Sequence, residues 1–422
     1  MGAAEKCILE ATMTSRIKLA VSCLLRPLQY CLYFISGFFP RDPRIWAFGS
    51  WGGQRFADNS AALFRYCCEM KGGPIKAVWI SPRKSIRQKI RAQGLVAYHP
   101  WSLGGMATCL KAGIYVFDLD RKDINYWLSR GAQCVLLRHG TGIKKIAKAI
   151  DNSSHHLFRL FHGRWIDRCI IQFFLPWHTA ELALVVATSE QHAQQAQMFF
   201  GVEPGKVVIT GSPRNDIMFL NGRNESIDNA STWIDKAHRE GKRTFVYMPT
   251  FRDDKSPAYP YSWVELDKLA GRVRISILVR MHPVDFAQPC GEQIRQLENV
   301  MFHDPNADPY RLFNEFDCLI TDYSSVVYDF MLLRKPVIFF CHDLESFRRN
   351  SRGFCFDYEE VTPGPRARTL CELEAAMKAF VDTDMKIGPY WEAYEKVLNR
   401  FHVFQDGHSS ERCYKAIVER LL

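Results

Sequence analysis

The sequence predicts an α/β protein built from two similar halves that face each other across a cleft. Three observations support this prediction. Short apolar runs, typical of buried parallel strands, recur along the chain with helical or loop segments between them. A polar stretch, 221–243, divides these runs into two sets. The length of 422 residues is also large for a single core, so two domains are expected.

The predicted strands fall into a first set of six runs and a second set of five. The first set is Ile45–Phe48, Ala77–Ile80, Ile114–Phe117, Cys134–Leu137, Val185–Ala187 and Val207–Ile209. The second set is Phe245–Met248, Ile275–Val279, Val300–Phe302, Cys318–Thr321 and Val337–Phe340. We therefore expect a first domain over 43–225, a linker over 226–242, a second domain over 243–385 and terminal helices over 386–422 that pack back towards the first domain.

Residues 1–42 precede the first strand and contain one strongly apolar stretch, Ile17–Phe39. Arg26-Pro27 interrupts it and leaves fewer apolar residues than the roughly 20 of a spanning helix. Basic flanks and an aromatic-rich apolar side are typical of a helix that lies in the plane of a membrane surface. A helix packed against the protein has a similar pattern, so both interpretations stay open. No small-residue cleavage site follows, so a signal peptide is not expected.

The composition is that of an ordinary globular protein, with 47% hydrophobic and 24% charged residues. A net charge of +10 favours an anionic partner such as a nucleotide, a phosphate polymer or a membrane surface, although surplus surface Lys and Arg give the same number. No helix-turn-helix, zinc or RNA-binding signature is present, so nucleic acid is not an expected partner. The 14 cysteines form no Cys-x-x-Cys pair, so no zinc site is predicted.

The stretch Cys318–Phe340 combines a buried strand, a polar turn and an apolar helix. In a parallel sheet such a turn faces the ligand crevice, and the free N–H groups that open the helix favour an anion. Ser324 and Ser325 would add hydroxyl donors for a bound phosphate. They would serve equally well as ordinary helix caps.

Polar motifs follow several other predicted strands. They are Arg138-His139-Gly140-Thr141-Gly142, Thr210-Gly211-Ser212-Pro213-Arg214-Asn215-Asp216, Pro249-Thr250-Phe251-Arg252 and Arg280-Met281-His282-Pro283. A histidine at the mouth of a sheet is placed to accept a proton near neutral pH, and an arginine there can clamp a phosphate. Each motif alone is also compatible with a purely structural role.

The order and spacing of these motifs resemble the CDP-glycerol glycerophosphotransferases, the family of teichoic acid primases and polymerases. The matching pieces are Phe48-Gly49-Ser50, Asp58-Asn59-Ser60, His139-Gly140-Thr141, Thr210–Asp216, Met248–Arg252, His282-Pro283, Thr321–Val326 and the tail Asp406-Gly407…Ser410-Glu411-Arg412. The resemblance covers roughly Ile45 to the C-terminus. Two positions depart from the family pattern: Gly142-Ile143 stand where proline and leucine are usual, and His408 where a lysine or similar residue is common.

The resemblance implies a GT-B fold, with two Rossmann-like domains and the donor nucleotide held mainly by the second. It implies transfer of glycerol phosphate, or a related polyol phosphate, from a CDP-activated donor to a hydroxyl of a lipid-linked or polymeric acceptor. CMP is released, and the product is a teichoic-acid-like or capsular polymer. Family members are peripheral membrane proteins, so a location on the cytoplasmic side of a bacterial cell membrane is expected. Neither a cofactor nor a metal is expected.

The matching motifs supply the candidate site residues. His139 is the expected general base, and His282 is expected to stabilise the departing CMP. The donor-side candidates are Thr250, Arg252, Pro283, Thr321, Asp322, Ser324, Ser325, Ser212, Arg214 and Asp216. The acceptor-side candidates are Gly140, Thr141, Lys144, Asp58 and Asn59.

Three alternatives remain. Asp253-Asp254 offers carboxylates for magnesium, although GT-B transferases usually need no metal. A GT-B glycosyltransferase with a nucleotide-sugar donor would have the same fold and phosphate site. A non-catalytic protein that binds an anionic polymer or a membrane through its positive charge would tolerate changes at both histidines.

Overall fold

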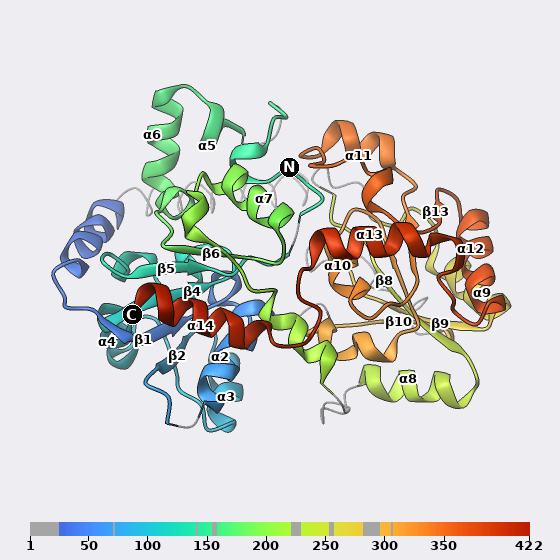
Figure 1. Cartoon of the computed structure of the whole chain (residues 1–422), viewed down its shortest axis with the longest axis horizontal. Helices are drawn as coiled ribbons and strands as arrows, with labels where there is room; N and C mark the ends of the chain where they lie inside the picture. Colours follow the sequence, from blue (N-terminus) through green and yellow to red (C-terminus); the bar gives the residue numbers. More distant parts are fainter. Residues whose placement is uncertain are drawn as a thin grey trace, which may run out of the picture.

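The computed structural model describes residues 25–70, 72–140, 142–153, 158–220, 229–252, 257–281, 296–304 and 307–422. They form two α/β domains, each built on a parallel sheet (Figure 1). Trp46 and Phe48 pack into the core on one face of the first sheet, whereas Ala47 packs into the core on the other. Phe245 and Val246 divide in the same way between the two faces of the second sheet. Both faces of each sheet are therefore covered, which explains the continuous apolar runs.

The strands run in the order β3-β2-β1-β4-β5-β6-β7 in the first sheet and β10-β9-β8-β11-β12-β13 in the second. The first sheet contains β1 (Asp42–Phe48), β2 (Lys76–Ile80), β3 (Ala97–Tyr98), β4 (Ala112–Phe117), β5 (Gln133–Leu136), β6 (Leu184–Ala187) and β7 (Val207–Ile209). The second contains β8 (Arg243–Met248), β9 (Ile275–Val279), β10 (Val300–Phe302), β11 (Cys318–Thr321), β12 (Val337–Phe340) and β13 (Arg366–Ala367). All predicted strands are present. The edge strands β3 and β13 were not predicted, because two residues each are too short for a periodic pattern.

The helices of the first domain are α2 (Asp58–Glu69), α3 (Lys84–Ala92), α4 (Leu103–Lys111), α5 (Phe158–His162), α6 (Trp165–Phe174) and α7 (Glu190–Phe200). Those that follow are α8 (Asn229–Arg239), α9 (Trp263–Val273), α10 (Val326–Met331), α11 (Leu344–Asn350), α12 (Leu370–Asp382), α13 (Trp391–Phe401) and α14 (Ser409–Leu421). The segment expected to be a linker contains α8. Its residues Ala230 and Ile234 are buried in a core cluster of the second domain, so α8 is part of that domain.

Each sheet has a point where the strand order reverses. β1 lies between β2 and β4, and β8 lies between β9 and β11. Loops that follow the two strands at such a point leave in opposite directions and open a crevice at their carboxyl ends. In the second domain these loops are the Thr250–Arg252 segment after β8 and the Asp322–Ser325 turn after β11. The fold thus places both motifs at one crevice.

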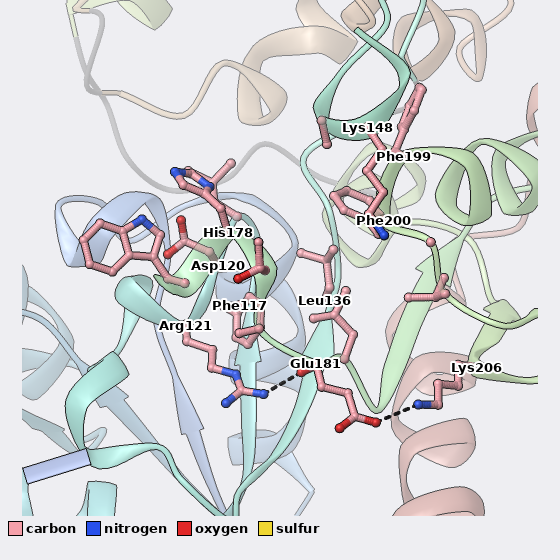
Figure 2. A pocket seen from close by; sticks show the side chains of 18 of the residues that line it. Phe117, Asp120, Arg121, Leu136, Lys148, His178, Glu181, Phe199, Phe200 and Lys206 are labelled. Atoms are coloured by element: carbon pink, nitrogen blue, oxygen red, sulfur yellow. Dashed lines mark hydrogen bonds and ion pairs between the residues drawn. The ribbon is translucent and has the colours of Figure 1, made fainter. Parts of the chain in front are cut away.

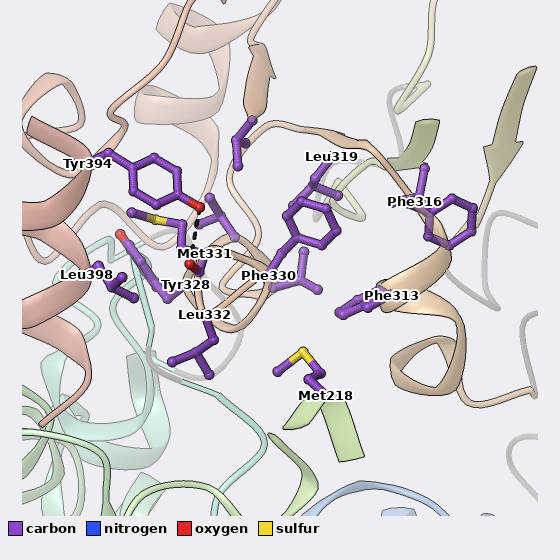
Figure 3. Packing of buried hydrophobic residues seen from close by; sticks show 14 of the residues in the cluster. Met218, Phe313, Phe316, Leu319, Tyr328, Phe330, Met331, Leu332, Tyr394 and Leu398 are labelled. Carbon is purple, nitrogen blue, oxygen red and sulfur yellow. Dashed lines mark hydrogen bonds between the residues drawn. The ribbon is translucent and has the colours of Figure 1, made fainter. Parts of the chain in front are cut away.

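The helix that follows this turn is anchored by a core cluster shared between the domains. All six residues of α10 are buried. Tyr394 of α13 donates a hydrogen bond from its hydroxyl to the Met331 carbonyl at 3.2 Å, and Leu398 packs beside it (Figure 3). Met218, which belongs to the 3-10 helix η7 (Pro213–Phe219) after β7, reaches the same cluster from the first domain (Figure 3).

The last helix, α14, packs on the first domain. Cys413 and Ile417 are buried in the core cluster that contains Trp46. The Asp216 carboxylate accepts hydrogen bonds from the backbone N–H groups of Ser409 at 2.8 Å and Ser410 at 2.7 Å. Asp216, a donor-side candidate, is thus a cap for the N-terminus of α14. Two of the motifs identified in the sequence meet here in a structural contact.

Replacement of Asp216 by alanine is expected to lower the free energy of unfolding by about 1–2 kcal/mol, because α14 loses its cap. Urea denaturation measures the change, with Asp382→Ala as the control. Asp382 pairs with Lys378 on the exposed surface of α12, so its loss is expected to cost less than about 0.5 kcal/mol. An unchanged unfolding curve combined with a raised KM for the donor would restore Asp216 to the donor site.

Residues 25–36 form a helix before β1, in the second half of the predicted membrane-associating stretch. One side packs on the first domain, where Tyr33 stacks on Tyr126 with ring centroids 4.9 Å apart. The other side is open, with Leu28 60% and Phe34 51% exposed. Among the helices that the structure describes, none is both long and apolar enough to cross a membrane.

Candidate active site

The loop after β5 meets the turn after β11 across the cleft. Gly140 has a φ of +148°, and a Cβ at this position would lie only 2.6 Å from the Ser325 hydroxyl oxygen. Only glycine permits this close approach of the backbone to the serine. An acceptor-side candidate of the first domain therefore lies against a donor-side candidate of the second.

The residues after Gly140 continue along the second domain. Lys144 forms an antiparallel bridge with Phe354, and the Ile143 carbonyl accepts a hydrogen bond from Cys355 N at 2.7 Å. Ile143 is 1% exposed and belongs to the core cluster of α10. This position departs from the usual family pattern, and its side chain here serves the contact between the domains.

His139 sits in this loop beside two residues that follow β1. The Trp51 ring lies edge-on to the imidazole, with ring centroids 5.6 Å apart. Although part of the imidazole is exposed to solvent, partial desolvation between the domains lowers the pKa of His139. The Asp58 carboxylate opposes this shift and the Arg214 guanidinium adds to it. The neutral imidazole, which can accept a proton, is thus favoured near pH 7.

The backbone around His139 is strained. Trp51, Asp58 and Arg138 have φ angles of 51°, 69° and 63°, in the left-handed region that residues other than glycine rarely adopt. Hydrogen bonds hold this geometry: Trp51 Nε1 donates to Asp58 at 3.1 Å, and Asn59 donates to the Arg138 carbonyl at 2.7 Å. Strain of this kind persists where the surrounding structure enforces it, often at functional sites.

Arg214 joins the His139 loop to both domains. Its Nη1 lies 2.6 Å from Asp58 Oδ1 and donates to the His139 carbonyl at 2.7 Å. Its Nη2 lies 2.5 Å from Asp329 Oδ2 on α10. The side chains of Arg214, Asp58 and Asp329 are at most 7% exposed. Arg214, expected on the donor side, and Asp58, expected on the acceptor side, therefore form one buried bridge that fixes His139.

Arg252 forms a second buried bridge beneath the Asp322–Ser325 turn. Its Nη1 lies 2.9 Å from Asp322, and its Nε lies 2.6 Å from Asp343 at the start of α11. Burial alone would lower the pKa of Arg252, but the two carboxylates outweigh it and raise the pKa above its ordinary value. With 2% of its side chain exposed, Arg252 does not form the open phosphate clamp that the sequence predicts. It holds the turn in place instead.

Two threonines complete this arrangement. The Asp322 carboxylate accepts from Thr250 N at 2.9 Å, and the Thr321 hydroxyl donates to the Met248 carbonyl at 2.8 Å. Thr250, Arg252, Thr321 and Asp322 thus lie together, with the Thr250 N–H and the Arg252 guanidinium bound to Asp322 and the Thr321 hydroxyl bound to Met248. All are supports of the crevice rather than parts of its open surface.

Ser324 and Ser325 lie at the surface of the crevice. Both are half-buried, and the Ser325 hydroxyl makes no capping bond to α10. The Ser324 hydroxyl accepts a long contact of 3.4 Å from Val326 N. Ser212 is buried at the N-terminus of η7, again without a side-chain cap bond.

Thr141, His282, Pro283, Asp253 and Asp254 lie outside the residues that the structure describes. Within its described ranges, no group of three or more His, Cys, Asp or Glu side chains could hold a metal ion.

The sequence did not predict several residues that form the site. Trp51 carries no recognisable motif. Asp329 lies within the stretch Cys318–Phe340 and Asp343 lies just after it, and each had a usable signal. Asp329 is a carboxylate in an otherwise apolar helix, and Asp343 follows the end of β12.

Comparisons with known proteins agree with this geometry. The family model of CDP-glycerol:poly(glycerophosphate) glycerophosphotransferases matches residues 31–419. The chain is 25% identical over 420 residues to a teichoic acid glycerol-phosphate transferase of Staphylococcus aureus. The alignment covers 95% of this chain and 99% of that protein. It is 26% identical over 422 residues to a teichoic acid poly(glycerol phosphate) polymerase of Bacillus spizizenii, over 97% and 100% of the two chains.

A solved structure of the wall teichoic acid polymerase TagF has the same fold, with a TM-score of 0.72 over 100% of this chain and 99% of that one, at 20% identity. The predicted GT-B architecture is thus confirmed. The family model spans both domains and every loop that meets at His139. The chain therefore belongs to the CDP-glycerol:poly(glycerophosphate) glycerophosphotransferase family of transferases.

Proposed function

We propose that the protein transfers glycerol phosphate from CDP-glycerol to a hydroxyl of a lipid-linked or polymeric acceptor and releases CMP. The observation that carries this proposal is the contact between the His139 loop and the Ser325 turn. The loop that carries His139 in one domain lies against the turn that precedes α10 in the other, which supports this proposal. The names of the relatives in S. aureus and B. spizizenii support the same substrate class.

In this mechanism the acceptor hydroxyl gives its proton to the neutral imidazole of His139 while its oxygen attacks the β-phosphorus of the donor. The bond between that phosphorus and the oxygen bridging to the α-phosphate breaks, and CMP departs with the electron pair. The hydroxyls and N–H groups at Ser324 and Ser325 stabilise the charge that develops, and His282 is proposed to assist them. Arg252 acts indirectly, since it fixes the turn.

We propose that this reaction needs no cofactor or metal. The imidazole takes the proton, and the serine turn with His282 stabilises the phosphate charge. CMP release is accordingly expected to proceed at an unchanged rate in EDTA. A rate that falls with EDTA and returns with magnesium would contradict this proposal.

The experiment that tests the function is a donor screen. Purified protein and a lipid-linked acceptor extract are incubated with CDP-glycerol, CDP-ribitol or a UDP-sugar, and the released nucleotide is identified by chromatography. CMP from CDP-glycerol that depends on the acceptor is the expected result. CMP from CDP-ribitol alone would change the polyol. Release of UDP from the sugar donor, with no CMP from either CDP-polyol, would favour the nucleotide-sugar glycosyltransferase.

We further propose that the protein works at the inner face of the cytoplasmic membrane as a peripheral protein. The helix at 25–36 and α6 lie side by side, because Tyr30 stacks on Phe173 with ring centroids 5.4 Å apart. Together they expose a set of large apolar side chains: Leu25, Leu28, Phe34, Ile35, Trp165, Ile166, Ile170 and Phe173. Arg164 and Arg168 are exposed on or next to α6. An apolar surface with basic residues is typical of interfacial binding to anionic lipids.

Glutamate at Ile170 and Trp165, 53% and 70% exposed, is expected to weaken binding to anionic vesicles at least tenfold. Each change removes an apolar side chain and adds a negative charge. Vesicle sedimentation measures the binding. Val403→Glu is the matched control, since Val403 is 54% exposed and lies on neither helix. Equal loss in all three variants would show that this surface does not contact the membrane.

A further inference from the structure

A cavity of about 380 Å³ lies in the first domain, and no step of the proposed mechanism uses it (Figure 2). Its volume is at the lower end of the range for small-molecule sites, about 300–1,000 Å³. It lies between the ends of β4 and β5, the C-terminal end of α7 and two 3-10 helices, η4 (Ala147–Ala149) and η5 (Pro176–Thr179). The cavity is large enough for a small organic ligand.

The cavity has one aromatic wall and one polar wall. Phe199 and Phe200 at the end of α7 lie on one side, close to Lys148 (Figure 2). Asp120 and His178 lie together on the opposite side (Figure 2). An ion pair between Glu181 and Lys206, 3.0 Å apart, closes the edge. A ligand here would meet aromatic faces and hydrogen-bonding groups at the same time.

The polar wall is suited to hydroxyl groups rather than to a charged ligand. Burial raises the pKa of Asp120 and lowers that of His178, so both side chains are drawn towards their neutral forms. Around the cavity the acids Asp120, Glu181 and Glu203 face the bases Arg121, Lys148 and Lys206, so the lining is neutral when Asp120 is ionised and carries a single positive charge when Asp120 is protonated. A polyanion would gain little from such a lining. A ring with apolar C–H faces and several hydroxyls would satisfy both walls.

The cavity also connects the apolar surface to the catalytic loop. Pro176, the first residue of η5, follows α6 after one residue, so the cavity residue His178 is only a few positions along the chain from the surface proposed to face the membrane. On the other side, the guanidinium of Arg138 lies 5.4 Å from the Phe199 ring and 5.7 Å from the Phe200 ring. Arg138 immediately precedes His139. The cavity thus lies next to Phe199 and Phe200, on which the residue before His139 packs.

We propose that this cavity binds a neutral sugar ring of the lipid-linked acceptor, an assignment that rests on the function proposed above. Phe200 packs against the C–H face of the sugar, and Asp120 and His178 exchange hydrogen bonds with its hydroxyls. The site gives the acceptor a binding region separate from the donor crevice. It thereby selects acceptors that carry a sugar.

A direct binding measurement tests the site without any turnover. Octyl β-glucoside, below its micelle concentration, is the probe, and saturation-transfer NMR on the full chain reports contact with its ring protons. Wild type is expected to show transfer, and Ala180→Trp, which fills the cavity, is expected to reduce it at least threefold. Ala92→Trp is the control, since Ala92 is exposed on α3. Equal transfer in both variants would overturn the proposal.

A second probe and a kinetic comparison distinguish a sugar site from an apolar one. Octyl tetraoxyethylene ether carries the same octyl chain without a sugar. If wild type bound this ether and Ala180→Trp abolished its binding as it does that of octyl β-glucoside, the sugar assignment would be overturned. In turnover, Asp120→Asn and Ala180→Trp are expected to raise KM at least tenfold for a sugar-bearing acceptor. KM should not change for CDP-glycerol or for the same lipid with glycerol phosphate attached directly.

The two proposals can fail separately. Equal losses with both acceptors would contradict the sugar site and leave the transferase function intact. Absence of CMP release by wild type with either acceptor would contradict the function. The NMR result would then decide alone whether the cavity binds a sugar.

Discussion

His139→Ala is expected to lower kcat by about 10²–10⁴-fold with little change in KM for CDP-glycerol. The loss has the size of a missing general base, and the donor contacts proposed at the second domain remain. CMP release with saturating acceptor measures it. His408→Ala is the control, because His408 is 66% exposed on the tail and lies outside the cleft. A loss below about threefold for His139→Ala would show that another group takes the proton.

The pH dependence gives an independent test of the same role. A general base works in its neutral form, so activity is lost as the pH falls through the pKa of His139. Because the cleft lowers that pKa below its ordinary value of about 6.5, the acidic limb of kcat is expected below pH 6. Asp58→Asn removes the carboxylate that opposes the shift and should move this limb still lower. Movement of the limb to higher pH in this variant would contradict the assignment.

Most of the fold could be predicted from the sequence, because strands buried on both faces leave continuous apolar runs. The periodic signal fails for β3 and β13, which have two residues each at the sheet edges. The sequence pattern also assigns α8 to a linker. Polar residues dominate this segment, so its two buried residues Ala230 and Ile234 do not stand out as an apolar face.

The contacts of the arginines in the candidate site could not be predicted from the sequence. Arg214 pairs with Asp58, which is 156 positions away in the sequence, and with Asp329, which is 115 positions away. No local pattern indicates which carboxylate an arginine will meet at such separation. A buried arginine in a motif therefore has the same sequence signal as one that binds phosphate. Ser325 and Gly140 were predicted on opposite sides of the site, and the fold brings them into contact.

Arg214→Gln is expected to lower the free energy of unfolding by about 3–5 kcal/mol at pH 7. The substitution leaves two buried carboxylates, Asp58 and Asp329, without their cation, and removing one partner of a buried pair has a cost of this size. Urea denaturation measures the change. Arg348→Gln is the control, since its bridges to Glu345 and Glu359 are exposed and should contribute less than about 1 kcal/mol.

The destabilisation by Arg214→Gln should shrink as the pH is lowered from 7 to 5. In the wild type, burial would raise the pKa of Asp329, but Arg214 outweighs it and lowers the pKa. Asp329 therefore stabilises the fold at neutral pH, and this contribution is lost only as the pH falls through its depressed pKa. Without Arg214 only His402 and the hydrogen bonds from Tyr310 and Asn215 still oppose the burial, so the pKa of Asp329 rises and protonation at lower pH relieves the buried charge. A deficit that stays constant between pH 7 and 5 would mean that lost packing of the guanidinium on the Tyr310 ring, 4.6 Å away, dominates instead.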